Sequence, residues 1–383
     1  MIQKKAYTFR LYPTNEQVTF FHQCMGSARF LYNAMLGEFQ SRRKAGVPPF
    51  PLPKVTDYKK SFPWMKTVDS LALCHAHRNL VQAFINHRDH PEHFGLPMFK
   101  KKGTFPWTYT TNNQKGTITI VGNKIKLPKL KRLVPIRLHR QVKGVIKRAT
   151  VSRRANGQYS IAILVEEDVR ELPKTGKSVG VDLGLLDFAA LSNRNKLPNP
   201  HFSKPFERKL RREKRKLSRR IVKAKTLVQK DPNKNWRDCR NLEKQRLKVA
   251  KLYAKVNNRK TDFLHKRSTE LVKSHDLLVV EDLPVKRLVR NHHLAKSIHD
   301  VSWSRFTDML KYKSRWYGKA FIKIDRFFAS SQICSACGHK DGKKALAIRE
   351  WDCPQCGTHH DRDINAAINI LNEGRKRIAA SKT

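Results

Sequence analysis

Val179-Gly180-Val181-Asp182-Leu183 is a short apolar run of the kind that forms a buried strand, and it carries an acid near its end. Gly184 to Asp187 is predicted to turn, and Phe188 to Leu191 to return as the second strand of a hairpin. Residues 275–281 form another apolar run, which ends in Glu281. The two runs predict strands that lie side by side in one sheet.

A third acid, Asp363, opens a predicted helix over residues 363–371 that ends at Gly374. Together with Asp182 and Glu281 it predicts a carboxylate cluster able to hold two Mg²⁺ ions about 4 Å apart. Such ions activate a water and stabilise the leaving oxygen of a phosphodiester. Three neighbouring acids are given no catalytic role. Asp187 is interpreted as a turn residue, Asp282 as a polar group on the side of a helix, and Asp361 as a local hydrogen-bonding group.

Four of the seven cysteines form two Cys-x-x-Cys pairs, Cys334 with Cys337 and Cys353 with Cys356. Fifteen residues separate the pairs, and a glycine follows each of them directly. This spacing predicts a four-cysteine zinc ribbon with a closed, structural Zn²⁺ site. A redox dithiol is the alternative, which the two matched pairs disfavour.

Charge indicates the partner. The 383 residues include 80 Lys or Arg against 31 Asp or Glu, a formal net charge of +49, with 39% hydrophobic residues. This composition predicts two or three folded domains that bind nucleic acid. We find neither a targeting segment nor an apolar run long enough to span a membrane, and we expect a cytoplasmic protein.

The charge is concentrated between residues 207 and 260, where 22 Lys or Arg face 5 Asp or Glu. Apolar residues recur there at helical spacing, which predicts a helical hairpin that turns at Asp231-Pro232-Asn233. A solvated helix face is the simpler interpretation of a charge run. Because so few acids are available for pairing, we favour contact with phosphates.

The N-terminal part predicts a small β-barrel interrupted by helices. A strand over residues 4–11 precedes a capped helix start at Thr14, and helical periodicity continues to about residue 88 with one proline-rich break. Short alternating runs then predict strands over residues 107–111, 117–121, 124–127, 134–138, 145–151 and 159–165. Residues 173–177 are predicted to be a linker, residues 295–317 one helix and residues 320–324 another strand.

Gly180 to Gly184 could also be the first phosphate loop of an ATPase of the actin and sugar-kinase fold. That fold needs a second Asp-x-Gly loop and a glycine-rich adenosine loop, which the sequence lacks. The charge would also be unexplained.

Several segments resemble the TnpB family of insertion-sequence proteins, which are RNA-guided DNA nucleases similar to compact type V CRISPR effectors. The resemblance spans nearly the whole chain in the family's order, and its most specific segment is His360-Asp361-Arg362-Asp363-Ile364-Asn365-Ala366-Ala367. The other matching segments are residues 9–14 with 16–17, 28–33, 95–100, 181–184 with 187–189, 281–283, and 330–332 before Cys334.

The resemblance implies a multidomain α/β and β protein with a RuvC-like nuclease domain of ribonuclease H fold. Its catalytic and Mg²⁺-binding acids would be Asp182, Glu281 and Asp363. The implied organisation is a wedge barrel over 1–13 and 101–172, a helical recognition insert over 14–100, nuclease parts over 176–333 and 357–383, and the zinc ribbon over 334–356. Cys356 lies seven residues before Asp363. We therefore hypothesise that bound zinc fixes the position in which Asp363 approaches the other two acids.

In function, the resemblance implies a transposon-derived guide RNA, a short flanking motif read by the protein, and hydrolysis of double-stranded target DNA. One protein chain would bind one RNA in a bacterial or archaeal cytoplasm, at the nucleoid when on DNA. The predicted nucleic-acid contacts are Tyr7, Phe9, Arg29, Trp107, Tyr109, Arg211, Arg212, Lys214, Arg215 and Arg362, with Asn365 as a further phosphate-positioning residue. The alternatives are a transposase that binds element ends, a non-catalytic RNA-binding repressor or transposition regulator, and an RNA-independent DNA-binding protein.

Overall fold

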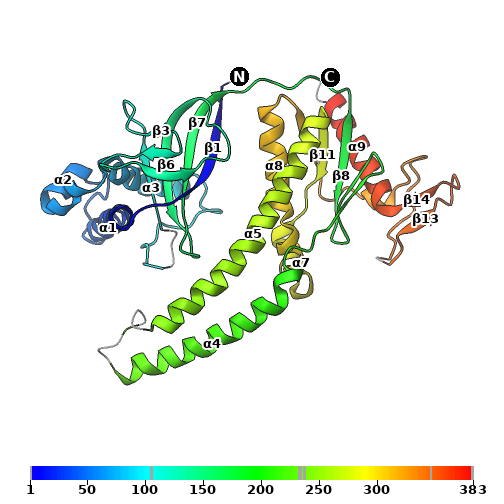
Figure 1. Ribbon diagram of the computed structural model, residues 1–383. Helices are drawn as coiled ribbons and strands as arrows, with labels where there is room; N and C mark the ends of the chain where they lie inside the picture. The colour runs from blue at the N-terminus through cyan, green and yellow to red at the C-terminus, as the bar shows by residue number, and fades with distance from the viewer. Residues whose placement is uncertain (1, 104–106, 232–234, 236–238, 346, 381–383) are drawn as a thin grey trace. The chain divides into compact units, whose positions relative to one another are not determined.

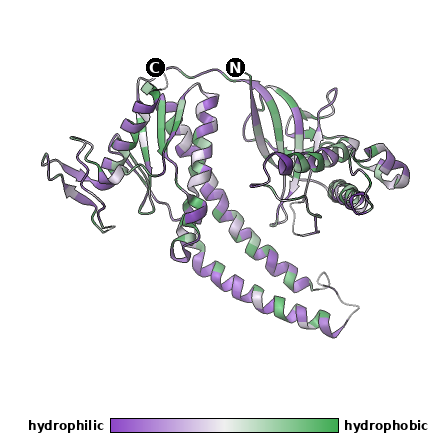
Figure 2. Cartoon of the chain, turned by 180° about the vertical axis from the view of Figure 1, so that it is seen from behind, coloured by the Kyte–Doolittle hydropathy of each residue, from purple (hydrophilic) through white to green (hydrophobic). Residues whose placement is uncertain are grey.

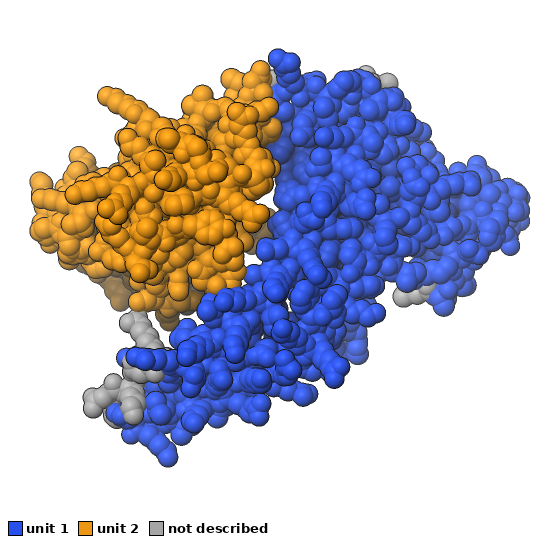
Figure 3. Space-filling view, viewed as in Figure 1, with its two compact units in different colours: residues 1, 169–383 blue, residues 2–168 orange. Residues whose placement is uncertain are grey.

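The computed structural model describes residues 2–103, 107–231, 235, 239–345 and 347–380. The chain divides into two compact units, one formed by residues 2–168 and the other by residue 1 with residues 169–383 (Figure 3). Each unit has its own main sheet (Figure 1). Buried apolar residues form a separate core in each unit. Within the described residues, no helix is long and apolar enough to cross a membrane.

The unit of residues 2–168 is built on a seven-stranded antiparallel sheet in the order β2-β6-β7-β1-β5-β4-β3. Its strands are β1 (Ile2–Leu11), β2 (Trp107–Asn112), β3 (Thr119–Val121), β4 (Lys124–Lys126), β5 (Val134–Arg137), β6 (Val145–Arg153) and β7 (Tyr159–Asp168). All the predicted strands of this part are present. Among the described residues no pairing joins the end strands β2 and β3, so closure into a barrel stays a prediction.

Helices lie between β1 and β2 in the sequence, as predicted. They are α1 (Asn15–Lys44), α2 (Val55–Ser61), the 3₁₀ helix η1 (Pro63–Thr67) and α3 (Ser70–Asp89). Thr14 caps α1 in a capping box with Gln17, because the Thr14 hydroxyl accepts from the Gln17 N–H and the Gln17 side chain accepts from the Thr14 N–H. Buried residues of α1 and α3 pack against the sheet and share its core.

The second unit holds a five-stranded sheet in the order β10-β9-β8-β11-β12. Its strands are β8 (Ser178–Leu183), β9 (Asp187–Leu191), β10 (Lys196–Pro198), β11 (Leu277–Glu281) and β12 (Ala320–Ile324). β8, β11 and β12 run parallel, whereas β8, β9 and β10 form the antiparallel edge. The predicted hairpin of β8 and β9 and the predicted neighbourhood of residues 178–183 and 277–281 are therefore both present.

Helices cover both faces of this sheet (Figure 1). On one face, apolar residues of α5 (Arg240–Ser274) and α8 (Trp303–Trp316) pack against Val179, Val181, Leu278 and Val280. On the other, α9 (Arg362–Ala380) packs against Leu277, Val279 and Ile324. The short helices η2 (Lys204–Phe206), α6 (Val285–Leu288), α7 (His292–Val301) and η4 (Ser330–Gln332) and the two-stranded pair β13 (Glu350–Asp352) with β14 (His359–Asp361) complete this unit.

Two helix predictions need correction. The single helix predicted over residues 295–317 is two helices, α7 and α8, because Ser302 has a left-handed backbone with φ of +57°. The last helix does not end at Gly374 but continues to Ala380. Gly374 is a packing position inside the helix, where a Cβ atom would overlap the side chain of Val279.

The predicted basic hairpin is formed by α4 (Glu207–Lys230) and α5, whose N-terminal half pairs with α4. Buried Gln245 joins the two helices, since its amide donates to the Glu213 carboxylate over 2.7 Å and its oxygen accepts from Arg220 over 3.1 Å. The hairpin is mostly hydrophilic in Figure 2, with scattered apolar residues. Pro232 and Asn233, where the turn was predicted, lie outside the described residues.

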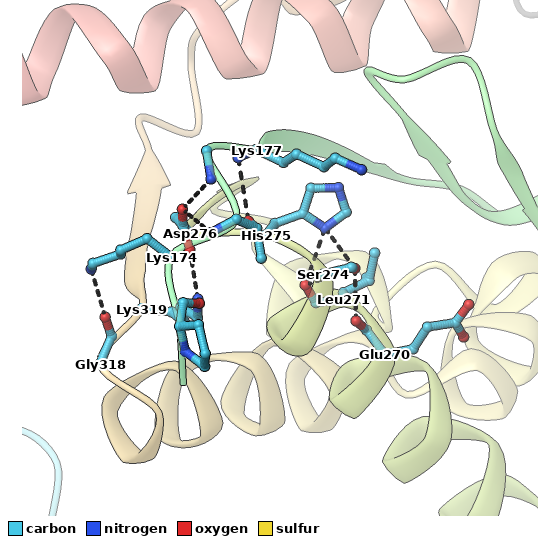
Figure 4. Close-up of polar contacts among 12 residues, drawn as sticks. Lys174, Lys177, Glu270, Leu271, Ser274, His275, Asp276, Gly318 and Lys319 are labelled. Carbon is cyan, nitrogen blue, oxygen red and sulfur yellow. Dashed lines mark hydrogen bonds and ion pairs between the residues drawn. The ribbon is translucent and has the colours of Figure 1, made fainter. Parts of the chain in front are cut away.

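The segment ahead of β8 is anchored to the start of β11 by Asp276 (Figure 4). One Asp276 oxygen accepts from the backbone N–H groups of Thr175 and Gly176, each over 2.7 Å. The other accepts from Lys319, whose buried ammonium also donates to the Pro173 carbonyl over 2.6 Å. These bonds fix the predicted linker at the end of the sheet opposite Glu281.

Candidate functional site

Asp182 and Glu281 project from the same face of the five-stranded sheet. Val280 pairs with Val181 in the parallel register of β11 and β8, which places Glu281 beside Asp182. The two carboxyl groups therefore lie side by side, and a Glu281 oxygen accepts from the Leu183 N–H over 3.3 Å. Because side chains alternate along a strand, both acids face the side of the sheet that α9 covers.

The charge of Asp363 acts on Asp182, and α9, which carries Asp363 in its first turn, packs very closely against β8. At Gly180 there is no room for a Cβ atom, which would collide with the Ala367 carbonyl oxygen and the Leu371 side chain. Gly374 gives the same close approach to β11. The first turn of α9 therefore comes to the end of the strands that carry Asp182 and Glu281.

Asp361 fixes the start of α9. Its Oδ1 accepts from the backbone N–H groups of Asp363 and Ile364, each over 3.0 Å, in the manner of a helix N-cap. Its Oδ2 accepts from Lys196 of β10 over 2.6 Å. The interpretation of Asp361 as a local hydrogen-bonding group therefore holds, and the structure adds an ion pair to a distant strand that sequence spacing could not reveal.

Burial, the neighbouring Glu281 and the negative charge of Asp363 together hold the pKa of Asp182 well above its usual range. Burial likewise raises the pKa of Glu281. Neighbouring acids repel one another unless a cation is bound, and all the donor atoms of Asp182, Glu281 and Asp363 are oxygens. The donor set therefore fits Mg²⁺.

Two arginines lie at this cluster. Arg349 approaches Asp363, with 3.5 Å between Nη1 and Oδ1, and was not among the predicted site residues. Arg362 is held by the segment before β13, since its guanidinium donates to the Ala345 carbonyl over 2.8 Å. Among the described residues, the cation that forms an ion pair with Asp363 is thus Arg349 and not Arg362.

The four cysteine Sγ atoms lie within 4.8 Å of one another. The Cys334–Cys356 and Cys337–Cys353 sulfur distances are 3.7 Å and 3.6 Å, close to the edge of about 3.8 Å expected for a tetrahedron with Zn–S bonds of about 2.3 Å. Gly338 and Gly357 adopt φ of +81° and +66°, which closes each turn. The four cysteines therefore fit the predicted structural Zn²⁺.

The cysteine cluster is joined to α9 by three side chains. His360, just before the helix, lies with Nε2 3.0 Å from the Cys334 sulfur. Asn365 bridges the first cysteine turn, because its oxygen accepts from the Ser335 N–H and its amide donates to the Ile333 carbonyl, both over 2.8 Å. Asn369 donates to the same carbonyl over 2.6 Å. Asn365 is 1% exposed, so it holds the cysteine turn and is not available to phosphates.

The predicted nucleic-acid contacts divide into buried and accessible groups. Phe9 and Tyr109 belong to the core of the first unit, and Tyr7 donates its hydroxyl to Glu167 over 2.6 Å, so none of these rings offers a free face. Trp107 and Arg29 line a pocket of about 360 Å³, together with Lys100, Lys101 and Lys102. Arg211, Arg212, Lys214 and Arg215 are exposed on α4.

Family comparisons cover much of the chain. Residues 160–292 match the family described as "Probable transposase", and residues 303–370 match "Cas12f1-like, TNB domain". Residues 1–47 match "Helix-turn-helix domain", although the described residues of that range form the strand β1 and the single helix α1.

Two solved structures share the fold. The chain resembles "Cryo-EM structure of the Cas12f1-sgRNA-target DNA complex" with a TM-score of 0.59 at 12% identity, covering 97% of this chain and 99% of the other. It resembles "Structure of the mini-RNA-guided endonuclease CRISPR-Cas_phi3" with a TM-score of 0.53 at 10% identity, covering 98% and 92%. The mixed α/β architecture with a four-cysteine cluster is thus a Cas12f-like fold.

Two relatives align over nearly the full length of the chain. A "Putative RNA-guided DNA endonuclease InsQ" from Escherichia coli (strain K12) is 27% identical, covering 100% of this chain and 95% of the relative. A "Putative RNA-guided DNA endonuclease" from Streptomyces pristinaespiralis is 34% identical over 381 residues, covering 97% of this chain and 89% of the relative. On this identity and coverage, together with the family matches, the chain belongs to the TnpB/IS605 family.

Proposed function

We propose that this protein is an RNA-guided DNA endonuclease whose catalytic acids are Asp182, Glu281 and Asp363. The observation that carries the proposal is the pair of acids Asp182 and Glu281 side by side on two parallel strands, with the charge of Asp363 in the first turn of α9 acting on Asp182, in a chain with a net charge of +49. The names of the full-length relatives agree with it. Such a protein hydrolyses a phosphodiester, in which a water oxygen bonds to phosphorus and the bond to the leaving oxygen breaks.

The three acids would hold two Mg²⁺ ions. Bound Mg²⁺ supplies a Lewis acid that lowers the pKa of a coordinated water and stabilises the charge on the phosphate. The chain's own contribution is positioning: Leu183 N–H orients Glu281, and the Asp361 cap orients the turn that carries Asp363. Arg349 is placed to contact a phosphate oxygen once Asp363 binds metal, because its guanidinium already lies at that acid.

We assign the parts of the chain accordingly. Residues 176–333 and 357–383 form the RuvC-like nuclease, and the Zn²⁺ ribbon of residues 334–356 holds α9 through Asn365 and Asn369. The first unit is the wedge with its helical insert over residues 14–100. Its basic pocket beside Trp107, and the exposed α4 cations, bind guide RNA or target DNA.

The test is to express the chain with its native flanking DNA, sequence the RNA that copurifies, and assay the complex with Mg²⁺ on a plasmid library with randomised flanks. We expect cutting specified by the RNA, next to one short flanking motif. Asp182→Ala should keep the RNA and lose the cutting. Asp308→Asn, which changes an exposed acid of α8, is the matched control.

The same experiment tests an alternative function, because residues 160–292 match the family described as "Probable transposase". A transposase would bind element ends and join strands without RNA. Strand transfer by RNA-free protein, with no guide-dependent cutting, would favour that function. A defined RNA with binding but no cutting would favour a repressor instead.

A further inference from the structure

A pocket of about 660 Å³ opens directly after the strand that carries Glu281. It is lined by Leu283, Pro284, Arg287, Arg290, Arg326 and Phe327, among others. Glu281 pairs with Ile324 at the ends of β11 and β12, so Arg326 and Phe327 leave the sheet beside the residues that follow Glu281. The pocket is therefore adjacent to the acid cluster but none of the three acids lines it.

The pocket is strongly basic. Lys286, Arg287 and Arg290 are exposed, and among the described residues no carboxylate forms an ion pair with any of them. Arg326 is held in place, because its guanidinium donates to Asp282 over 2.7 Å. Unpaired guanidinium groups at one site are suited to the oxygen atoms of phosphates.

Phe327 adds a feature that phosphate binding alone does not require. The residue is 83% exposed, the largest value for any large apolar residue in the described part of the chain. Its backbone is fixed, because the Phe327 N–H donates to the Asp325 carboxylate over 2.8 Å. An exposed aromatic ring among arginines is the arrangement with which proteins stack unpaired bases and follow their phosphates.

We propose that this pocket is a subsite for single-stranded DNA at the acid cluster, in which Phe327 stacks on one base while Arg287 and Arg290 contact the neighbouring phosphates. The inference rests on the proposed function. The ligand is an unpaired strand because a base inside a duplex offers no free face to the ring. It is the DNA being cut, because the strand nearest the acids is the one whose phosphate they hydrolyse.

The first test combines a protein variant with a substrate variant. Abasic nucleotides are placed one at a time around the cut site of the target strand. We expect one position to slow cutting by the wild-type complex by about 5- to 100-fold, the usual contribution of one base stacked on an aromatic ring. The Phe327→Ala complex should cut intact DNA more slowly by a similar factor, and an abasic nucleotide at that position should not slow it further. Phe327→Trp should restore both the cutting rate and the sensitivity to the abasic nucleotide.

Matched controls separate stacking from general damage. Phe94→Ala removes another exposed phenyl ring, far along the chain, and should keep the wild-type abasic profile. Arg290→Ala should slow cutting at every abasic position alike, whereas Arg375→Ala, an exposed arginine of α9, should not. Because Phe327 is so exposed, its truncation should leave the melting temperature unchanged. A Phe327→Ala complex that cuts at the wild-type rate with the wild-type abasic profile would overturn the proposal.

A second readout does not depend on cutting. Target strands containing 5-iododeoxyuridine near the cut site are irradiated in complex with the protein, and the crosslinked peptide is identified by mass spectrometry. We expect a crosslink at Phe327. A crosslink of the labelled strand only to peptides that lack Phe327, or no crosslink to the protein at all, would contradict the subsite. If the wild type crosslinks DNA at Phe327 but never cuts, the proposed function fails while the subsite stands.

Discussion

At the residue scale, the neighbourhood of Asp182 and Glu281 could be predicted, because each of the three candidate acids stands at a recognisable place in the sequence. Asp182 and Glu281 end apolar runs, and Asp363 opens an amphipathic one. Arg349, Lys196 and His360 were not predicted as site residues. Each meets the site only through folding, since Lys196 is 165 positions from its partner Asp361. A sequence pattern indicates only how far apart residues are along the chain. These contacts depend instead on how β10 and the cysteine ribbon are placed around α9.

Lys313 provides a prediction for pH. Its ammonium is buried between α8 and α5 and donates to the His265 carbonyl and the hydroxyls of Ser268 and Thr269. Burial lowers the pKa of Lys313 to about 8. Since an unfolded lysine keeps its proton to about pH 10.4, the stability of the fold should rise as pH increases between these values, by up to about 3 kcal/mol.

Chemical unfolding between pH 7 and 10 measures this effect. Lys313→Met should remove the rise, and Lys311→Met, a change at an exposed neighbour on the same helix, should retain it. The same slope in wild type and Lys313→Met would show that the buried ammonium does not cause it.

At the element scale, the central feature is the contact of α9 with the sheet. Periodicity predicted the helix, but the prediction assigned Gly374 to its end, because glycine commonly terminates helices. The structure uses Gly180 and Gly374 for close approach instead. Neighbouring residues along the chain do not distinguish these two roles of glycine.

Gly180→Ala should therefore push α9 away from β8. We expect a loss of about 1–3 kcal/mol in stability, the usual range for overpacking, and a larger proportional loss of cutting because Asp363 moves with the helix. Gly95→Ala, at a position with open space around it, is the control. Urea unfolding with cleavage rates measures both effects, and unchanged values for Gly180→Ala would contradict this account of α9.

The cysteine cluster and α9 should also be coupled through His360. The His360 Nε2 hydrogen bond to the Cys334 sulfur orients that ligand, so His360→Phe should lower Zn²⁺ affinity by about 10- to 100-fold. His359→Phe, at the exposed neighbouring position, should not. Competition with a chromogenic chelator measures the affinity. Equal Zn²⁺ affinity in His360→Phe and wild type would contradict the assigned role.

At the scale of the whole molecule, the net charge of +49 predicted a nucleic-acid partner before any motif was considered. The sequence also indicated the two sheets, because each has its own run of strand signals. It could not indicate which basic residues remain exposed. The structure answers this for α4, where Arg212, Lys214 and Arg215 are exposed, whereas Glu213 is buried against Gln245.

This exposure leads to a prediction for salt dependence. If the α4 cations contact phosphates, replacing Arg212, Lys214 and Arg215 by alanine should weaken RNA or DNA binding and make it less sensitive to salt. The slope of log K against log salt should fall by about 0.7 to 0.9 for each lost contact. Replacing exposed Arg375, Lys376 and Arg377 of α9 tests whether any loss of three charges has this effect. Equal slopes for the two triple variants would contradict a specific role for α4.

The most direct measurement of the central claim compares guide-dependent cutting by the wild type, Asp182→Ala, Glu281→Gln, Asp363→Asn and the control Asp308→Asn, all loaded with the copurified RNA. The account predicts that each of the three acid variants keeps the RNA and the target but cuts at least about 1,000-fold more slowly, as expected when several kcal/mol of metal-assisted catalysis is lost. Asp308→Asn should cut like the wild type. Undiminished cutting by any one of the three acid variants would contradict the assignment.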